Sequence, residues 1–164
     1  MNYQTQFSNN LIKIKNMQVL PIEFGTPEHD ESIRLRYDVL RRPLGLEYSA
    51  EALAAEYNEF HIGFYDEKSV LRGVLLLAPY SETVVKMRQV AVDAGFQRQG
   101  IGNQLVAFSE VFAKSKGFTK IVLHARAVAV PFYEKLSYTI FGEPFEEVGI
   151  PHRAMEKNLN SIKF

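Results

Sequence analysis

The stretch QRQGIG, residues 97–102, places two glycines at the start of a segment with helical periodicity. Glycine is a poor helix former, so Gly100 and Gly102 weaken this start unless a bare backbone is needed there. The first turn of a helix presents unpaired N–H groups and a partial positive charge, which together favour phosphate binding. With Arg98 as a counter-charge, the stretch predicts a phosphate-binding loop. The alternative is that the glycines only let the helix pack closely on a sheet.

Two familiar phosphate loops do not fit this stretch. A P-loop needs a Gly-Lys-Ser/Thr string, which does not occur. A dinucleotide fingerprint needs a third glycine where Leu105 stands. The predicted loop is therefore of another kind.

The loop motif resembles that of the GNAT acetyltransferase superfamily, Gln/Arg-x-x-Gly-x-Gly/Ala, which Gln97, Gly100 and Gly102 match. The downstream stretch LHARAVAVPFYEKLSY is similar to a second signature of that superfamily. The resemblance covers roughly residues 17–158, and RYDVLRRPLGLE, KMRQVAV and EEVGIPHRAM are similar to a bacterial subgroup with mostly unassigned acceptors. Arg98 stands where many members carry glycine, which we expect to cost little. Ser137 replaces another usual glycine, so we expect a less tight turn there.

The resemblance implies that acetyl-CoA is the co-substrate and that no metal takes part. Its pyrophosphate would bind the loop amides, and its pantetheine arm would pair with the backbone of the apolar run that precedes the loop. The cofactor-binding residues implied in this way are Val90, Ala91, Val92, Gln97, Arg98, Gln99, Gly100, Ile101, Gly102, Phe132 and Lys135.

The implied reaction is the attack of a primary amine, on a small-molecule or peptide acceptor, at the thioester carbonyl. A backbone N–H near Val90 or Val92 would stabilise the oxyanion. Tyr133 occupies the position that supplies the acid for the leaving thiolate in many members, although it could also only pack. His124 and His152 lead the candidates for the base, followed by Glu147 and Glu47. The other hypotheses are a non-catalytic CoA or acyl-CoA sensor and an interaction module without a ligand.

The pair Arg41 and Arg42 stands in the segment that usually shapes the acceptor pocket. Arginines there would suit a carboxylate or phosphate on the acceptor. The alternative is the solvated basic end of a helix.

The elements that must position these residues follow from periodicity and turn signals. Helices are predicted from Pro27 to before Pro43, after the cap Ser49, from the glycine loop to Gly117, and near Pro131. In the first helix Ile33, Tyr37 and Leu40 are predicted to face the core. Strands are predicted over 17–24, 59–65, 70–78, 83–92, 119–125, 138–142 and 152–158. The order β α α β β β α β α β β predicts an α/β (α+β) fold, a GNAT-like mixed sheet of six to seven strands with four helices. A break in the alternation near Val90 predicts a β-bulge.

Length and composition limit the function classes. The 164 residues predict a single acyltransferase domain over 17–164 behind a flexible leader, residues 1–16, with Met17 as an alternative start. Equal numbers of basic and acidic residues, 19 each, argue against a nucleic-acid partner. The absence of cysteine excludes thiolate nucleophiles and cysteine-based zinc sites. The longest apolar run, VLLLA, is too short for a membrane span, and we expect a cytoplasmic protein. The closing strands leave a sheet edge that would allow a homodimer.

Overall fold

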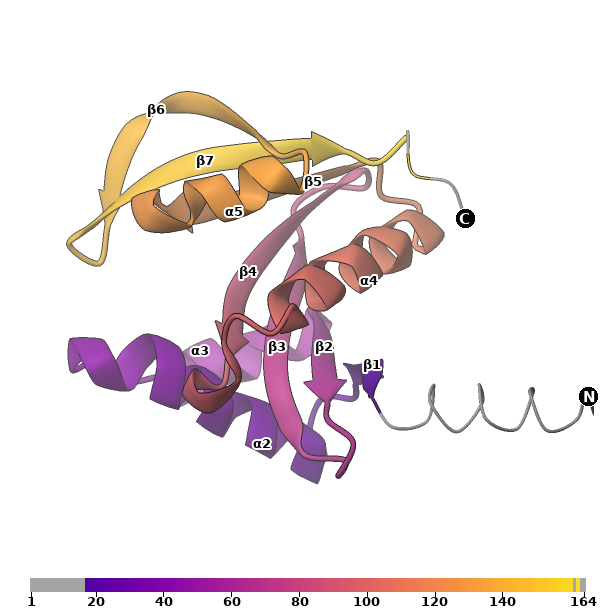
Figure 1. Cartoon of the computed structure of the whole chain (residues 1–164), viewed down its shortest axis with the longest axis vertical. Helices are drawn as coiled ribbons and strands as arrows, with labels where there is room; N and C mark the ends of the chain where they lie inside the picture. The colour runs from indigo at the N-terminus through magenta and orange to yellow at the C-terminus, as the bar shows by residue number, and fades with distance from the viewer. Residues whose placement is uncertain (1–16, 161, 163–164) are drawn as a thin grey trace, which may run out of the picture.

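The computed structural model describes residues 17–160 and 162, so the leader predicted over 1–16 lies outside the described residues. Seven strands form one sheet in the order β1-β2-β3-β4-β5-β7-β6 (Figure 1). They are β1 (Gln18–Ile22), β2 (Phe60–Tyr65), β3 (Leu71–Pro79), β4 (Val84–Val92), β5 (Lys120–Arg126), β6 (Thr139–Glu147) and β7 (Ile150–Asn158). The helices are α2 (Pro27–Arg36), α3 (Ala50–Ala54), α4 (Ile101–Ser115) and α5 (Val130–Lys135). The predicted element order and fold class are confirmed, although both closing strands are longer than predicted.

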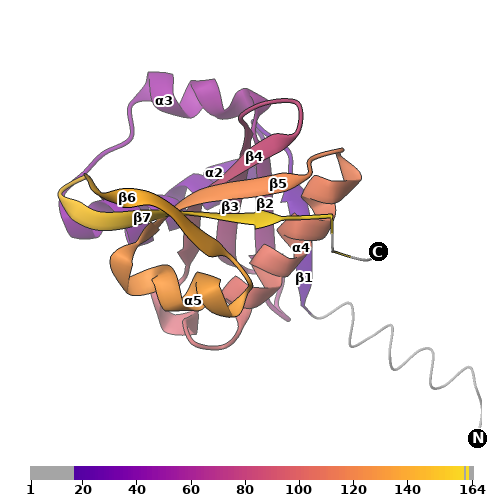
Figure 2. The same ribbon diagram turned by 90° about the horizontal axis from the view of Figure 1, so that it is seen from above.

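Helices cover both faces of the sheet. In Figure 2, α3 lies on one side of the strands and α4 and α5 lie on the other. The larger core lies under α4 and α5 and includes Leu75, Met87, Leu105 and Ile121, all almost fully buried. A smaller apolar cluster between α2 and the sheet includes Val74 and Ala91. Within the described part of the chain, no helix is long and apolar enough to cross a bilayer.

Helix α2 begins as predicted but buries a different face. Thr26 caps it by accepting a hydrogen bond from the backbone N–H of His29 at 3.3 Å. The most buried side chains of α2 are His29, Ser32 and Arg36, whereas Ile33 is only half-buried, so the predicted core face was wrong for Ile33, although Leu40 packs against the smaller apolar cluster as predicted. The reason is electrostatic, because the fully buried Arg36 donates to the Glu56 carboxylate at 2.9 and 3.2 Å. A buried ion pair takes the place of an apolar contact, although Nε and Nη2 of Arg36 have no hydrogen-bond partner among the described residues.

Beyond Arg36 the helix changes its winding. A π-helical turn (Tyr37–Arg41) and a 3-10 turn (Arg42–Leu44) follow, ending at Gly45 with a φ of 65°. A π turn takes more residues than an α turn and therefore rotates the side chains that follow it. This irregular segment is the elbow predicted between the first two helices. Ser49 then caps α3 as predicted, accepting from the Ala52 N–H at 3.1 Å.

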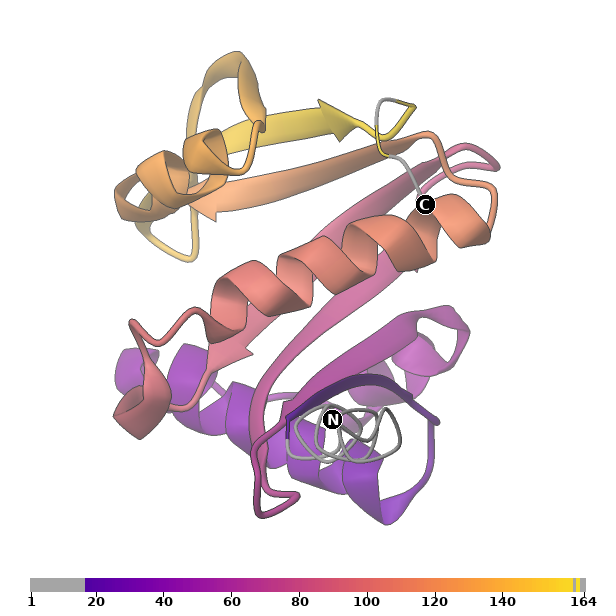
Figure 3. The same cartoon turned by 45° about the vertical axis from the view of Figure 1, so that its right-hand side comes forward.

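Strands β4 and β5 pair over half their length and then part. The parallel pairing runs from Val84 with Lys120 to Met87 with Leu123 and stops there. In β4 the register to β3 then shifts, with Arg88 opposite Leu76 and Ala91 opposite Val74, and Gln89 has a φ of 55°. This is the predicted bulge. The strands diverge beyond it in Figure 3, with α4 lying across them.

Two helix ends make the same left-handed turn with different residues. After α4, Gly117 has a φ of 93°, and Phe118 N–H donates to Ala113 O at 3.1 Å. After α5, Ser137 has a φ of 71°, and Tyr138 N–H donates to Tyr133 O at 3.0 Å. Both are Schellman motifs, so the looser turn expected at Ser137 is wrong. The turn keeps its geometry, and the serine is strained instead.

Replacing Ser137 by glycine should raise the free energy of unfolding by about 1 kcal/mol, or the melting temperature by roughly 3 °C, because glycine adopts positive φ without steric cost. The matched control is Gly117→Ser, where the new side chain meets nothing within 4 Å, so the loss reports the backbone conformation alone. Chemical denaturation measures the free energy of unfolding of the Ser137→Gly and Gly117→Ser proteins. A Ser137→Gly protein that is no more stable, beside a destabilised Gly117→Ser protein, would contradict strain at Ser137.

Candidate functional site

A pocket of about 550 Å³ lies where β4 and β5 part. It is lined from both faces of the sheet, since Met87 and Tyr133 belong to the α5 side while Lys86 and His124 belong to the α2 side. The lining residues are Leu40, Arg41, Leu44, Leu46, Lys86, Met87, Arg88, Gln89, Val90, Leu123, His124, Ala125, Arg126, Ala129, Tyr133, Glu147, Val148 and His152. The volume is in the range of small-molecule sites. The parting of the strands therefore leaves a passage through the sheet.

Tyr133 lies on α5 with its ring packed edge-on against Phe132 at 4.9 Å and against Tyr138 at 5.7 Å. Only 7% of the residue is exposed, and burial raises the pKa of its phenol to about 12. The phenol is therefore protonated at neutral pH and available as a hydrogen-bond donor in the pocket. The packing role and the donor role are compatible, because the ring is buried while the residue lines the pocket.

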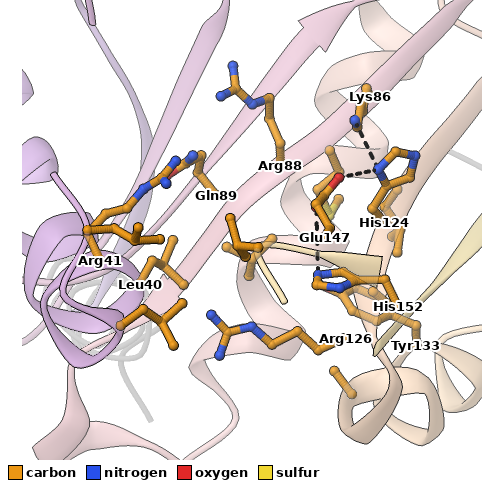
Figure 4. A pocket seen from close by; sticks show the side chains of 18 residues that line it. Leu40, Arg41, Lys86, Arg88, Gln89, His124, Arg126, Tyr133, Glu147 and His152 are labelled. Carbon is orange, nitrogen blue, oxygen red and sulfur yellow. Dashed lines mark hydrogen bonds and ion pairs between the residues drawn. The ribbon is translucent and has the colours of Figure 1, made fainter. Parts of the chain in front are cut away.

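Both candidate histidines contact one carboxylate. Glu147 Oε1 lies 3.0 Å from His124 Nδ1, and Glu147 Oε2 lies 3.6 Å from His152 Nε2 (Figure 4). Lys86 Nζ lies 3.3 Å from His124 Nδ1. Burial acts to raise the pKa of Glu147, but the hydrogen bond from His124 and the charges of His124, His152 and Lys86 outweigh it, so the pKa is lowered. Glu147 is thus held ionised between two imidazoles.

A hydrogen bond to a backbone carbonyl fixes the tautomer of His152. His152 Nδ1 lies 2.7 Å from the Ile150 carbonyl, which can only accept, so Nδ1 carries a proton and Nε2 is the free nitrogen of the neutral ring. His124 Nδ1 contacts both the Glu147 carboxylate, which can only accept, and the Lys86 ammonium, which can only donate, so these contacts do not fix its tautomer. In Figure 4 the other nitrogen of His124 points away from Glu147, whereas His152 directs Nε2 toward it. His152 is the better placed base.

A tight hairpin places Glu147 and His152. Strand β6 ends at Glu147, which pairs with Ile150, and the two linking residues Val148 and Gly149 both have positive φ, at 49° and 72°. This is the signature of a type I′ turn. The ring of Phe145 packs between the histidines, 4.9 Å from His124 and 5.8 Å from His152. The predicted strand had stopped short of this hairpin.

The glycine loop lies at the N-terminus of α4, beside the pocket rather than in its lining. Gly100 has a φ of 81°, and no side chain caps the helix. A Cβ at Gly102 would lie 3.2 Å from the Phe132 ring, so this glycine does allow close packing, here against α5. Because Phe132 is the neighbour of Tyr133, the start of α4 and the pocket are adjacent. The close-packing reading is therefore confirmed for Gly102, and the phosphate-binding reading of Gly100 stays a prediction.

The other residues of the loop agree with the sequence predictions only in part. The Gln97 side-chain amide donates to the Val92 carbonyl at 3.3 Å and ties the loop to the end of β4. Arg98 has a φ of 63°, so its expected low cost is wrong, because a left-handed conformation strains any residue with a Cβ. Of the predicted site residues, Val90, His124, Tyr133 and His152 meet in the pocket lining, and Ala91, Val92, Gln97, Arg98, Gln99, Gly100, Ile101, Gly102, Phe132 and Lys135 lie outside it.

Of the two arginines in the elbow, one lines the pocket. Arg41 lines the pocket, with its guanidinium 4.7 Å from the centre of the Tyr48 ring. Arg42 is exposed and pairs with Asp38 at 2.8 Å, as expected for the solvated end of a helix. Glu47 accepts a hydrogen bond from Tyr37 at 3.0 Å and does not line the pocket, so it is no longer a candidate base.

Sequence reasoning did not single out the lining residues Lys86, Gln89 and Arg126, or Tyr48, which contacts the lining residues Arg41 and Gln89. Tyr48 donates to Gln89 Oε1 at 2.5 Å, which fixes the bulge residue against the elbow. Lys86 and Arg126 alternate with buried apolar residues on their strands, and this alternation was the available signal. The neighbouring Arg88 is neutralised by Glu59 at 2.7 Å.

Comparisons with known proteins address the family and the fold of this chain. A family model described as an acetyltransferase (GNAT) domain matches residues 40–159. YyaT of Bacillus subtilis (strain 168), an uncharacterized protein, is 30% identical over 130 residues, which are 74% of this chain and 86% of that protein. A crystal structure from Lactobacillus plantarum has a TM-score of 0.79 at 24% identity, covering 88% of this chain and 99% of that one. A GNAT family acetyltransferase from Elizabethkingia anophelis, solved with acetyl-CoA bound, has a TM-score of 0.66 at 22% identity, covering 87% of this chain and 98% of that one.

A second cluster, His29, Glu56 and His61, has the composition of a metal site but not its chemistry. All three residues are buried, and their ligand atoms lie within 4.8 Å of one another. The Glu56 carboxylate is already bound by the Arg36 guanidinium, whose charge opposes a cation. His29 Nδ1 accepts from the Gly25 N–H at 3.2 Å, which leaves the proton of the neutral ring on Nε2, so neither nitrogen offers a free lone pair to a cation. The group therefore fits a structural role.

Stability should fall on acidification because of these histidines. Burial is the main cause that lowers the pKa of both His29 and His61 below 6.5. Below the pKa of histidine in the unfolded chain, the unfolded chain binds protons that the folded protein does not bind. Acidification therefore favours unfolding, and the free energy of unfolding decreases. Between about pH 7.5 and 5.5 we expect a loss of roughly 1 kcal/mol per histidine, measured by urea denaturation. The double variant His29→Gln/His61→Gln should lose this part of the pH dependence. An unchanged slope in that variant would contradict the assignment.

Proposed function

We propose that this chain, which belongs to the GNAT acetyltransferase family and is an acyltransferase enzyme, transfers an acetyl group from acetyl-CoA to a primary amine. The observation that carries the proposal is the pocket at the parting of β4 and β5, which joins Tyr133 on one face of the sheet to His152 on the other. A thioester and an amine can reach each other through such a passage. Each step of the reaction then has a candidate residue beside it.

The start of α4 would hold the pyrophosphate of acetyl-CoA. This helix has no capping side chain and no acid in its first turn, whereas α2 has both. Its first amide groups are therefore free to donate to phosphate oxygens, and the helix dipole favours the negative charge. Gly100 leaves open space above them, since a Cβ there would meet nothing within 4 Å. The residues fit a phosphate ligand.

The pantetheine arm would run along β4 past the bulge. Residues 88–92 have lost their partner strand on the β5 side, so their outward backbone groups can pair with an amide-containing chain. This would bring the thioester to Val90, near Tyr133. A backbone N–H of β4 would then stabilise the oxyanion of the tetrahedral intermediate.

His152 would accept the proton of the amine. Its Nδ1 hydrogen bond to Ile150 leaves Nε2 free, and the ionised Glu147 beside it would stabilise the imidazolium that forms. The amine nitrogen forms a bond to the carbonyl carbon, and the carbon–sulfur bond breaks as the intermediate collapses. His124 would act through Glu147, by holding its carboxylate in place.

Tyr133 would donate to the sulfur as it leaves. Its phenol is protonated at neutral pH because burial raises its pKa to about 12. A phenol of this pKa is a weaker acid than an ordinary thiol, so its main contribution is a hydrogen bond to the developing thiolate. A non-catalytic CoA sensor would need the α4 site but not this donor. The two hypotheses therefore differ in what each substitution should change.

Replacing Gly100 by aspartate should abolish acetyl-CoA binding, because a carboxylate would then stand beside the amides that receive the phosphates. For the wild-type protein, ligand at about 100 times its Kd should raise the free energy of unfolding by roughly 2.7 kcal/mol, measured as a thermal shift. Gly100→Ala controls for the strained φ, and we expect it to retain binding. Equal binding by Gly100→Asp would exclude the phosphate site at α4.

Replacing Tyr133 by phenylalanine should lower thiol release from acetyl-CoA by about 10²- to 10³-fold and leave acetyl-CoA binding intact, because only a hydrogen-bond donor to the developing charge is removed. Thiol release is followed spectrophotometrically with a panel of amines, and binding is followed by calorimetry. The buried neighbour Tyr138, which does not line the pocket, supplies the control variant Tyr138→Phe. If Tyr133→Phe turns over at the wild-type rate, Tyr133 has no role in the chemistry.

A further inference from the structure

The pocket has an excess of positive charge. Four of its lining residues are cationic, Arg41, Lys86, Arg88 and Arg126, and one, Glu147, is an acid. Arg88 is neutralised by Glu59, which lies outside the lining, and Glu147 is shared by two histidines and Lys86. Within residues 17–160 no carboxylate lies at ion-pair distance from Arg41 or Arg126. These two guanidinium groups are therefore uncompensated.

Arg41 is directed to the pocket by the backbone of the elbow. It ends the π-helical turn, and the next residue, Arg42, turns outward to Asp38. The Arg41 guanidinium stacks on the face of the Tyr48 ring. The Tyr48 hydroxyl donates a hydrogen bond to Gln89, which fixes the position of the ring. A stacked guanidinium keeps its N–H groups free to donate within its plane. Arg41 is thus a positioned donor without an acceptor.

Arg126 faces the same space from the opposite side. It is the last residue of β5 and lies in register with His152 of β7, so both side chains stand on one face of the sheet. In Figure 4 its guanidinium extends away from Tyr133 and His152 toward the side of the pocket where Leu40 and Arg41 lie. It is half-buried, which makes an unpaired charge more costly than at an open surface. An anion between Arg126 and Arg41 would relieve this cost.

The phosphates of the donor do not account for these cations. The residues at the start of α4, where the proposed pyrophosphate site lies, are not among the pocket lining. The Lys86 side chain, a third cation, belongs to the α2 side of the sheet, the side opposite α4 and α5. The positive charge therefore faces the half of the pocket that remains for the acceptor.

We propose that the acceptor amine carries an oxyanion, a carboxylate or a phosphate, which binds between Arg41 and Arg126 while its amino group lies near His152. The inference rests on the proposed function and names the substrate class of that site. Arginine pairs with either group through two parallel hydrogen bonds, so the recognition chemistry is shared. A polycationic amine would meet repulsion in the same place.

The test compares amines that differ only in the anionic group. The probes are glycine, β-alanine and γ-aminobutyrate, each with its carboxamide, and phosphoethanolamine with ethanolamine. Thiol release from acetyl-CoA measures transfer, and calorimetric titration of the protein, with and without CoA, measures binding in the absence of transfer. The variants are Arg41→Gln and Arg126→Gln, with Arg42→Gln as the matched control because that arginine faces solvent. Melting temperatures show whether each variant folds.

We expect at least one anionic probe to bind and react at least tenfold better than its neutral partner. Arg41→Gln and Arg126→Gln should each reduce this preference about 10- to 100-fold, mainly through KM, and Arg42→Gln should leave it unchanged. The carboxylate and phosphate arms show which oxyanion is preferred. Neutral amines that react as well as the anionic ones, an equal effect of Arg42→Gln, or no binding of any anionic probe would each overturn the inference. Selective binding of an anionic probe without thiol release would contradict the proposed acyl transfer but support the inference.

Discussion

The structure depends on the loss of backbone pairing between β4 and β5 after Met87 and Leu123. Buried strands normally satisfy their N–H and C=O groups on both sides, and leaving a row of them open is costly unless water or a ligand takes their place. Here the bulge at Gln89 turns β4 away from β5, and β5 continues with β7 as its remaining partner. The result is a passage through the middle of the sheet, with open backbone along β4 and side chains from the elbow, β4, β5, α5, β6 and β7 around it.

The surrounding residues maintain this parting from the side of the elbow and from the side of the hairpin. Tyr48 holds Gln89 with a hydrogen bond and supports Arg41 with its ring, which couples the elbow to the bulge. The type I′ turn after β6 brings Glu147 back over the sheet, where it joins the two histidines. On the opposite face Phe132 packs against Gly102, so the start of α4, Tyr133 and the passage keep a fixed relation. The strained conformations at Gln89, Arg98 and Val148 all lie in segments that border the pocket or the loop, as is common at functional sites.

The element order could be predicted from the sequence because α4 and the central strands have a clear period, and because caps such as Thr26, Ser49 and Gly117 mark helix ends. The bulge was visible as a break in alternation, and the glycine loop as a helix start without a cap. Other features depend on tertiary structure. The choice between Arg41 and Arg42 is made by a π-helical turn, which no residue pattern reveals. The positive φ at Arg98 and Ser137 is imposed by turns that remain in place without glycine. Arg126 lies just beyond the predicted strand 119–125, and only the structure shows that it ends β5 at the pocket.

Amide hydrogen exchange, followed residue by residue by NMR with and without saturating acetyl-CoA, tests the central claim most directly. If the open edge of β4 is the binding surface for the donor, amides within residues 88–92 should exchange at least tenfold more slowly with acetyl-CoA. Those of residues 97–102 should be protected together with them, and β1, at the far edge of the sheet, should not change. Protection of the α4 loop without any effect on residues 88–92 would mean that the donor binds without entering the passage, and the account of the parted strands would be wrong.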